Sequence, residues 1–241
     1  MMIAPGVEYR EGEGELLVQG EKVIPSVRRF FDLLTVLEDP SALKEDGNAY
    51  LMYRDLPPLR ARWVRFDVTI IPSWMVGREY AKTKGHYHMP PSAGRPSYPE
   101  IYQVHSGNAI YLLQRAGPSL KEIVDFIVVR ASPGDVVVIP PNYGHVTVNP
   151  GEETLVMSNL IYRGVESDYE PYERLRGAAY YYTIDGFIRN ERYSSVPEIR
   201  EGKPLWRSQS IAIDFLEDES SFSWLKDVDR ACEEGFLGVR C

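Results

Sequence analysis

The sequence predicts an all-β protein built as a small sandwich or barrel. Short runs rich in β-branched and aromatic residues repeat along the middle of the chain, and Gly and Pro separate them. The composition agrees, because 18 Pro, 19 Gly and 16 Tyr favour turns and half-buried strands over a helical bundle. Runs at this regular spacing are typical of a sandwich or barrel. They are residues 49–56, 62–72, 79–88, 100–114, 122–132, 135–141, 145–150 and 154–164.

Shorter segments decorate this predicted barrel. Residues 1–24 alternate short apolar pieces with Gly and Glu, which favours a hairpin. Residues 177–193 favour a second hairpin, with Asp185-Gly186 as its turn. Residues 26–47 place apolar side chains at helical spacing and predict one or two short helices. Together with the barrel, these elements form one predicted domain, residues 1–206.

Beyond residue 206 the composition changes, and we interpret residues 207–241 as a C-terminal extension. Within it, residues 221–234 predict an amphipathic helix with Trp224, Leu225 and Val228 on one face and Gly235 as its C-cap. Amphipathic helices bury their apolar face. We therefore expect the extension to pack on the barrel or on a dimer partner.

Charge and cysteine content exclude several classes of function. The balance of 27 Lys and Arg against 35 Asp and Glu gives a net charge of −8, the wrong sign for a protein that follows nucleic-acid phosphates. No apolar run approaches the ~18 residues of a membrane span. Cys232 and Cys241 are not closely spaced, so we expect neither a disulfide framework nor a cysteine zinc site. We expect a cytoplasmic homodimer, since dimerisation covers exposed barrel edges, with no nucleic-acid or membrane partner.

The histidines predict a metal site. His86 and His88 are two residues apart, so on a strand both imidazoles project from the same face and reach one ion. Glu100 opens a later strand and His145 another. Three imidazoles and one carboxylate suit Fe(II), Mn(II), Zn(II) or Ni(II), and suit Ca²⁺ or Mg²⁺ poorly.

The order of these residues resembles the two sequence motifs of the cupin superfamily, whose fold is a jelly-roll β-barrel, the double-stranded β-helix. The first motif is His-x-His, a spacer, Glu, six residues and Gly107; the second runs from Gly134 through Pro140 and His145 to Asn149. Two departures are mild. An eleven-residue spacer, residues 89–99, adds only slowly rising loop entropy, and Asn142 replaces a Gly at a position where Asn tolerates positive φ.

Longer strings narrow the resemblance to the archaeal cupin-type phosphoglucose isomerases, over roughly residues 26–206. They are FDVTIIP, TKGHYH, EIY, IPPNYGHVTVN and NLIYRG. The resemblance implies a metal-dependent isomerase that interconverts glucose 6-phosphate and fructose 6-phosphate, in glycolysis and gluconeogenesis. It also implies one divalent ion, Fe(II) in the first place, held by His86, His88, Glu100 and His145.

Two residues of one strand face are the candidate catalytic groups. Glu100 lies beside the metal, within reach of C1 or C2, and a carboxylate exchanges protons, so it is the candidate base. Its alternative role is that of a ligand only, and both an enediol mechanism and a hydride shift are compatible with the sequence. Tyr102 is two residues on, hence on the same face. It either donates to a substrate oxygen or packs in the barrel.

The substrate phosphate requires hydrogen-bond donors near the metal. Thr69, Thr83, Lys84 and the amide of Gly85 supply hydroxyl, ammonium and backbone N–H groups. The family resemblance adds Tyr50 and again Thr69 as phosphate contacts. It also places Tyr162 and Tyr169 near the sugar, with Ser167 where the family has a His.

Two further features have structural interpretations. His105 follows Glu100 by five residues, so it faces away from the metal and is read as a surface or interface residue. The Pro-rich spacer, which contains Arg95, is read as an exposed loop with no part in the chemistry, with cover over the barrel mouth as its alternative.

Two other functions fit the same residues. A cupin Fe(II) dioxygenase uses the same ligand set, and a sugar-binding or metal-binding cupin without turnover needs only the fold and the site.

Overall fold

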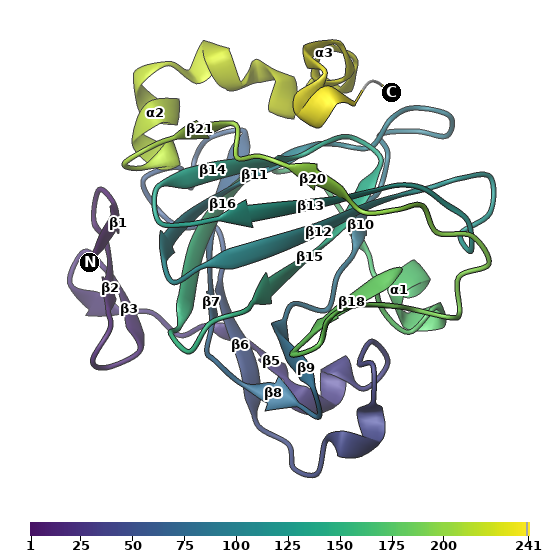
Figure 1. The fold of residues 1–241 in the computed structure, drawn as a ribbon. Helices are drawn as coiled ribbons and strands as arrows, with labels where there is room; N and C mark the ends of the chain where they lie inside the picture. The colour runs from purple at the N-terminus through teal and green to yellow at the C-terminus, as the bar shows by residue number, and fades with distance from the viewer. Residues whose placement is uncertain (240) are drawn as a thin grey trace.

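The computed structural model describes residues 1–239 and residue 241, and it confirms the predicted cupin-type β-barrel. Two large sheets, antiparallel except for one pair of strands, face each other (Figure 1). Buried side chains from both sheets meet in one core between them, among them Val137, Met157, Leu112 and Val128. The order of the first sheet is β21 (Trp206–Arg207), β14 (Asp135–Ile139), β11 (Glu100–Ser106), β16 (Leu155–Tyr162), β7 (Val64–Ile71), β6 (Asn48–Tyr53) and β5 (Ser26–Arg29).

The second sheet supplies the opposite wall and includes the predicted hairpin of residues 177–193. Thr183 pairs with Gly186 across the predicted Asp185-Gly186 turn, so this hairpin is confirmed. One strand in this sheet runs parallel to its neighbour, because β20 pairs in parallel with β13. The order is β19 (Gly186–Arg189), β18 (Tyr180–Thr183), β9 (Glu79–Lys82), β15 (Tyr143–Asn149), β12 (Ala109–Ala116), β13 (Ile123–Ala131) and β20 (Arg200–Gly202), with β8 (Met75–Val76) beside β9.

Strand β7 shows how the sequence divides between two cores. Its even-numbered residues Val64, Phe66, Val68 and Ile70 belong to a second core on the outer face of the first sheet. Its odd-numbered residues therefore point between the sheets, because side chains alternate along a strand. This alternation places Arg65, Asp67 and Thr69 on the inner wall of the barrel.

The N-terminal segment covers part of that outer face. It forms a four-stranded antiparallel meander instead of the predicted hairpin: β1 (Met2–Ala4), β2 (Val7–Arg10), β3 (Glu15–Val18) and β4 (Glu21–Lys22). Ile3, Val7 and Leu16 are buried in the outer core. Residues 26–47 contain two short helices, as expected, and both are 3-10 helices: η1 (Phe30–Leu33) and η2 (Pro40–Ala42). Strand β5 precedes them and was not predicted.

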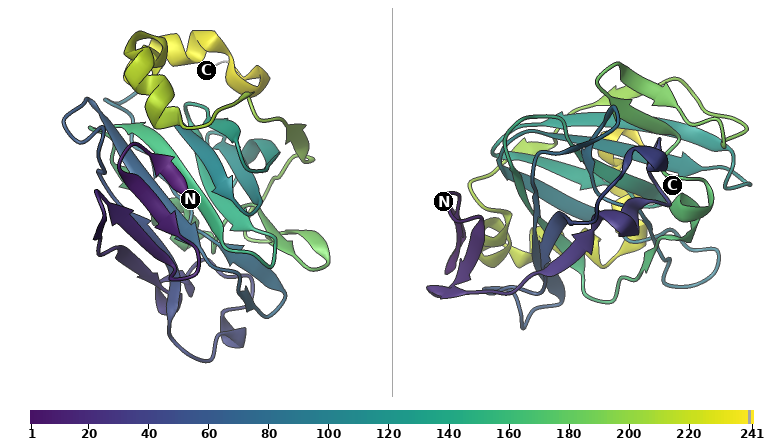
Figure 2. Two further views of the ribbon diagram at one scale, coloured as in Figure 1. Left: turned by 90° about the vertical axis from the view of Figure 1, so that its left-hand side faces the viewer. Right: turned by 90° about the horizontal axis from the view of Figure 1, so that it is seen from below.

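The C-terminal extension covers the rest of the same face. Figure 2 shows its yellow-green helices and the purple N-terminal strands on the outside of the barrel. Its apolar side chains Phe215, Phe222, Trp224 and Leu225 are buried in the outer core. The extension comprises α2 (Ile211–Glu217), η3 (Glu219–Leu225), α3 (Val228–Glu234) and η4 (Phe236–Gly238). Strand β21 straddles the domain boundary predicted at residue 206, and that boundary remains a proposal.

The single helix predicted over residues 221–234 is wrong. Two helices occupy this stretch because Asp218 and Asp227 each start a new one: their carboxylates accept hydrogen bonds from the backbone N–H groups of Ser221 and Arg230. Such N-caps satisfy N–H groups that a helix start leaves free. The predicted C-cap is confirmed, since Gly235 follows α3 with a φ of +66°.

The cysteine expectation is also wrong, because Cys232 and Cys241 form a disulfide with nine residues of sequence separation. The left-handed residues Gly235, Leu237 and Gly238 turn the chain back, so that two cysteines that are distant in sequence meet. Among the described residues, no helix has the length and apolar character needed to cross a membrane.

Candidate metal centre and cavity

The segment between β9 and β10 (Tyr87–His88) positions the first two histidines. Thr83 N–H donates to the Thr147 carbonyl at 2.8 Å, and Thr147 N–H donates to Thr83 Oγ1 at 2.9 Å. Gly85 then turns the chain with a φ of +80°, a conformation that favours glycine. After this turn His86 pairs with His145 through two backbone hydrogen bonds of 3.3 and 3.0 Å. Backbone pairing thus fixes two of the predicted ligands side by side.

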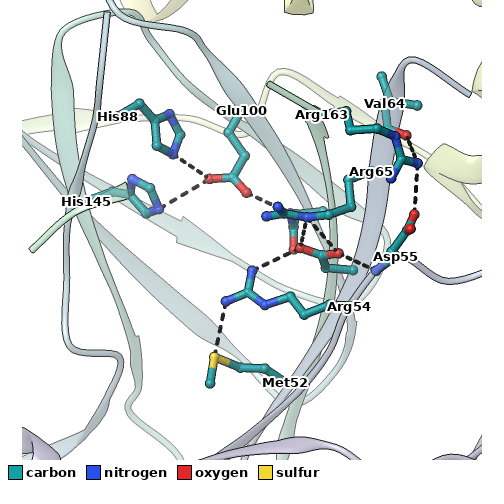
Figure 3. A network of polar contacts seen from close by, with 11 residues as sticks. Met52, Arg54, Asp55, Val64, Arg65, His88, Glu100, His145 and Arg163 are labelled. Carbon is teal, nitrogen blue, oxygen red and sulfur yellow. Dashed lines mark hydrogen bonds and ion pairs between the residues drawn. The ribbon is translucent and has the colours of Figure 1, made fainter. Parts of the chain in front are cut away.

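The structure brings the four predicted ligands together. His86, His88, Glu100 and His145 each offer one ligand atom, and these atoms all lie within 4.8 Å of one another. Glu100 Oε2 is 3.3 Å from His88 Nε2 and 3.4 Å from His145 Nε2 (Figure 3).

The electrostatics of this cluster suit a cation. Burial holds the pKa of His145 at about 4 and the pKa of His86 well below its ordinary value, so both imidazoles are neutral at pH 7 and present lone pairs. Burial pushes the pKa of Glu100 upward, but His88, His145 and Arg65 outweigh burial, the net shift is downward, and Glu100 is a carboxylate. Within the described chain, His88 Nε2 and Glu100 Oε2 are buried without a hydrogen-bond partner. A divalent ion fits these orphaned atoms and this donor set.

Neighbouring groups orient the ligands. His88 Nδ1–H donates to the Tyr98 carbonyl at 2.8 Å, which leaves Nε2 facing the centre. Asn159 Nδ2 donates to Glu100 Oε1 at 2.7 Å. Nothing in the sequence singles out Tyr98, which acts through its backbone carbonyl. Asn159 opens the string NLIYRG, but only Tyr162 of that string was assigned a role.

The Pro-rich spacer also has a structural role at the site, although residues 89–95 are exposed as expected. Its second half is anchored: Ser97 is buried, its N–H donates to Asn142 Oδ1 at 2.9 Å, and Asn142 N–H donates to Ser97 Oγ at 2.7 Å. Asn142 has the positive φ, +69°, that its place in the motif predicted. These bonds hold the Tyr98 carbonyl against His88.

A cavity opens from the cluster, and the space free of atoms within it, counted out to the open solvent at its mouth, is about 520 Å³. Hydroxyl, imidazole, guanidinium and carboxylate groups line it, which suits a small polar ligand. Strand alternation explains its inner wall, since Thr69 and Met157 pair in register, as do Tyr102 and Asn159. The predicted site residues that line it are Tyr50, Thr69, Thr83, Gly85, His86, Glu100, Tyr102, His145 and Tyr169.

Tyr102 points at the centre, with its hydroxyl 3.3 Å from His145 Nε2. Burial and the Glu100 charge raise its pKa well above the ordinary value, so the hydroxyl keeps its proton. Ser167 also lines the cavity, at the position where the family resemblance had led us to expect a His.

Two predicted residues are placed differently. The Lys84 ammonium pairs with Glu173 at 2.5 Å, and the Lys84 backbone N–H donates to the Tyr50 hydroxyl at 3.2 Å. Tyr162 does not line the cavity; its ring lies 5.0 Å from the ring of Tyr98, between centroids. Side chains alternate along β16, so Ile161 lines the cavity and Tyr162 points to the other face.

The cavity wall also contains two residues that the sequence analysis did not identify, Arg54 and Arg65. Both bind the buried carboxylate of Asp67, which is 1% exposed. Figure 3 shows the two guanidinium groups close to each other, beside the His88–Glu100–His145 group. Neither arginine lies in a recognised motif. Side chains alternate along RFDVT, residues 65–69 of β7, so Arg65, Asp67 and Thr69 share one face of the strand.

His105 lies outside the cluster, on the opposite face of β11 from Glu100. It is half-buried instead of fully exposed, and its Nε2 is 2.8 Å from Ser158 Oγ. Burial lowers its pKa from 6.5 to about 4. Between these pH values the unfolded chain binds a proton that the folded chain does not, so the free energy of unfolding falls as the pH falls.

We expect His105→Gln to lessen this acid destabilisation. In urea unfolding at pH 7 and pH 4.5, the wild type should lose up to about 3 kcal/mol more than the variant, since each pKa unit corresponds to about 1.4 kcal/mol. The amide of Gln retains a hydrogen-bonding group for Ser158 and does not titrate. Equal losses in both proteins would show that His105 does not contribute to acid unfolding.

Solved structures are similar to part of the chain. An oxalate decarboxylase of Bacillus subtilis superposes with a TM-score of 0.35 and 16% identity, over 52% of this chain and 29% of that chain. An oxalate oxidase superposes with a TM-score of 0.34 and 16% identity, over 50% of this chain and 52% of that chain.

Sequence relatives are more informative. The chain is 30% identical to the glucose-6-phosphate isomerase of Thermococcus onnurineus over 171 residues, 68% of this chain and 85% of the relative. It is 29% identical to the glucose-6-phosphate isomerase of Pyrococcus furiosus, over 64% of this chain and 77% of the relative. The family model for glucose-6-phosphate isomerase (GPI) matches residues 27–198, which include every residue of the cluster and the cavity wall. The chain therefore belongs to the glucose-6-phosphate isomerase (GPI) family.

Proposed function

We propose that the protein is a metal-dependent aldose–ketose isomerase that interconverts glucose 6-phosphate and fructose 6-phosphate. The observation that supports this most directly is the arrangement of the cavity. Four ligand atoms within 4.8 Å of one another lie at one end, and hydroxyl groups and a glycine turn suited to a phosphate lie along its wall. The similarity to glucose-6-phosphate isomerases supports the same substrate class.

The ion would be held by His86, His88, Glu100 and His145, whose neutral imidazoles and single carboxylate form an N₃O donor set. A divalent ion bound there supplies Lewis-acid polarisation of the oxygens on C1 and C2 of the opened sugar. We propose Fe(II), with Mn(II), Zn(II) and Ni(II) as alternatives. The choice of Fe(II), the homodimer and the cytoplasmic location remain predictions.

Glu100 moves the proton in this proposal. Its Oε2 has no hydrogen-bond partner in the described chain, while Oε1 is held by Asn159. An oxygen that would bind the ion through one lone pair keeps a second lone pair for a proton. Oε2 takes the proton from C2 of the open-chain aldose while O1 gains a proton, which gives the enediol. Oε2 then returns its proton to C1 while O2 loses one, so that glucose 6-phosphate becomes fructose 6-phosphate without a net gain or loss of atoms. The Tyr102 hydroxyl donates a hydrogen bond to a substrate oxygen on the same side of the cavity.

The phosphate would bind further along the wall. Tyr50, Thr69 and Thr83 present hydroxyl groups to the cavity, and Gly85 lets the backbone approach an oxyanion closely. Lys84 contributes through its backbone N–H, which holds the Tyr50 hydroxyl, since its ammonium is paired with Glu173. Tyr169 closes this end, with the guanidinium of Arg28 5.5 Å from its ring centre.

A coupled assay for conversion of fructose 6-phosphate to glucose 6-phosphate tests the function, with oxygen uptake measured in parallel on the same metal-loaded protein. We expect turnover without oxygen consumption. In D₂O, proton transfer through Glu100 should leave deuterium at C1 of the fructose 6-phosphate formed from glucose 6-phosphate. If none of the four metals supports turnover, the proposed isomerase activity is contradicted. Oxygen consumption would indicate a dioxygenase. Turnover without deuterium incorporation would indicate a hydride shift.

A further inference from the structure

The cavity contains two guanidinium groups that share one carboxylate. Asp67 Oδ2 accepts from Arg54 Nη1 at 3.0 Å and from Arg65 Nε at 2.8 Å. Asp67 Oδ1 accepts from the Asp55 N–H at 2.8 Å and again from Arg65 Nε at 3.1 Å. One buried negative charge thus meets two positive charges. The Arg54–Arg65 pair therefore leaves a surplus of one positive charge on the wall.

Several donors of this pair remain free. Within the described residues, neither Nη atom of Arg65 has a hydrogen-bond partner, and Arg54 Nη2 meets only the Met52 sulfur, at 3.2 Å. A thioether is a weak acceptor. Both arginines line the cavity, and the Arg65 side chain is only 25% exposed. Of the other nearby cations, Lys84 is paired with Glu173, and Arg28 lies at the phosphate end, 5.5 Å from the centre of the Tyr169 ring.

The strand register shows which end of the cavity the pair faces. Arg65 pairs with Ile161, which pairs with Glu100, so Arg65 lies in the same row across the sheet as a proposed metal ligand. Thr69, a proposed phosphate contact, is four residues along β7, about 13 Å from Arg65 at 3.3 Å per residue. The free donors are therefore at the metal end and not at the phosphate end.

We propose that Arg54 and Arg65 are specificity-determining residues that bind negative charge on the C1 end of the ligand. This rests on the proposed function and adds to its ligand class the sugar phosphates whose C1 end carries negative charge, such as the carboxylate of an aldonate or the oxyanion that develops during isomerisation. Guanidinium forks match a carboxylate or a developing oxyanion, and charge-assisted bonds in a partly buried site are strong. A 6-phosphorylated aldonate should therefore bind better than the matching alditol phosphate, which has the same phosphate but a neutral C1.

The test is calorimetric binding of gluconate 6-phosphate, glucitol 6-phosphate and inorganic phosphate to the metal-loaded protein. We expect the wild type to prefer the aldonate by about tenfold or more, which is the size of one or two charge-assisted hydrogen bonds. Arg65→Met and Arg54→Met should each lose most of this preference while the affinity for inorganic phosphate changes less than about twofold. Arg62→Met is the matched control, because it removes the same charge from an exposed side chain outside the cavity wall.

An unchanged preference in both cavity variants would overturn the proposal. So would a large loss of phosphate affinity in either variant, which would place the phosphate on the arginines. Using two variants keeps the test decisive if one of them does not fold. Binding does not require turnover, so a protein that discriminates the ligands through Arg65 but does not isomerise sugars would contradict the proposed function and not this inference.

Discussion

Replacing Glu100 by Gln is expected to lower kcat for sugar-phosphate isomerisation about a thousandfold at saturating metal. Removal of a general base has a typical cost of 10²–10⁴ in rate. Gln has nearly the same shape, and its side chain can still accept the hydrogen bond that Asn159 donates to Glu100 Oε1. The variant should therefore fold and lose the proton acceptor at Oε2. The coupled assay with added metal measures this loss.

The control for Glu100→Gln is Glu152→Gln, the same chemical change on an exposed residue in the turn before β16. Its kcat should stay within about twofold of the wild type. Metal content per chain, measured on the same samples, separates loss of the base from loss of a ligand. If Glu100→Gln retains the metal and more than a tenth of the wild-type kcat, Glu100 is not the base.

Gly85→Ala is expected to destabilise the protein by about 3 kcal/mol and to raise KM for the sugar phosphate by about tenfold. An added Cβ would lie 2.6 Å from Val146 Cγ2 and 2.8 Å from the ring of Tyr172, and both side chains are buried. Overpacking of this kind costs 1–3 kcal/mol, and the φ of +80° adds backbone strain. Relief requires the backbone next to His86 to move. Urea unfolding and steady-state kinetics measure the two effects.

Gly94→Ala separates strain from the steric clash. Gly94 has a nearly identical φ, +78°, but an added Cβ there meets nothing within 4 Å. It should cost about 1 kcal/mol and leave KM unchanged, since only the backbone preference is affected. Equal effects of the two substitutions would show that the packing around Gly85 does not position the site.

Local patterns were sufficient to predict the barrel. Alternating β-branched runs bounded by Gly and Pro marked the strands, and the residues of β7 illustrate why: one face fills the outer core and the other lines the cavity. The spacing of His86, His88, Glu100 and His145 identified the residues that the structure brings together. Backbone pairing fixes His86 beside His145. Their positions along the sequence were therefore enough to predict that they meet.

The remaining features depend on contacts between distant segments. The Tyr98 carbonyl meets His88 through a backbone atom, which has no sequence signature. Arg54 and Arg65 form a pair because both bind Asp67. Arg54 reaches Asp67 only through the register of β6 against β7. The split of the C-terminal helix was readable in principle, because Asp218 and Asp227 are good N-cap residues. The apolar spacing of Trp224, Leu225 and Val228 obscured it.

We propose that isomerisation requires an ion held by His86, His88, Glu100 and His145. The most direct measurement is turnover of fructose 6-phosphate by protein stripped with EDTA and then restored with Fe(II), Mn(II), Zn(II) or Ni(II), with metal content determined per chain. We predict that stripping abolishes turnover, that the protein remains folded, and that activity returns in proportion to the metal bound, up to one ion per chain. Full turnover by folded, metal-free protein would contradict the claim.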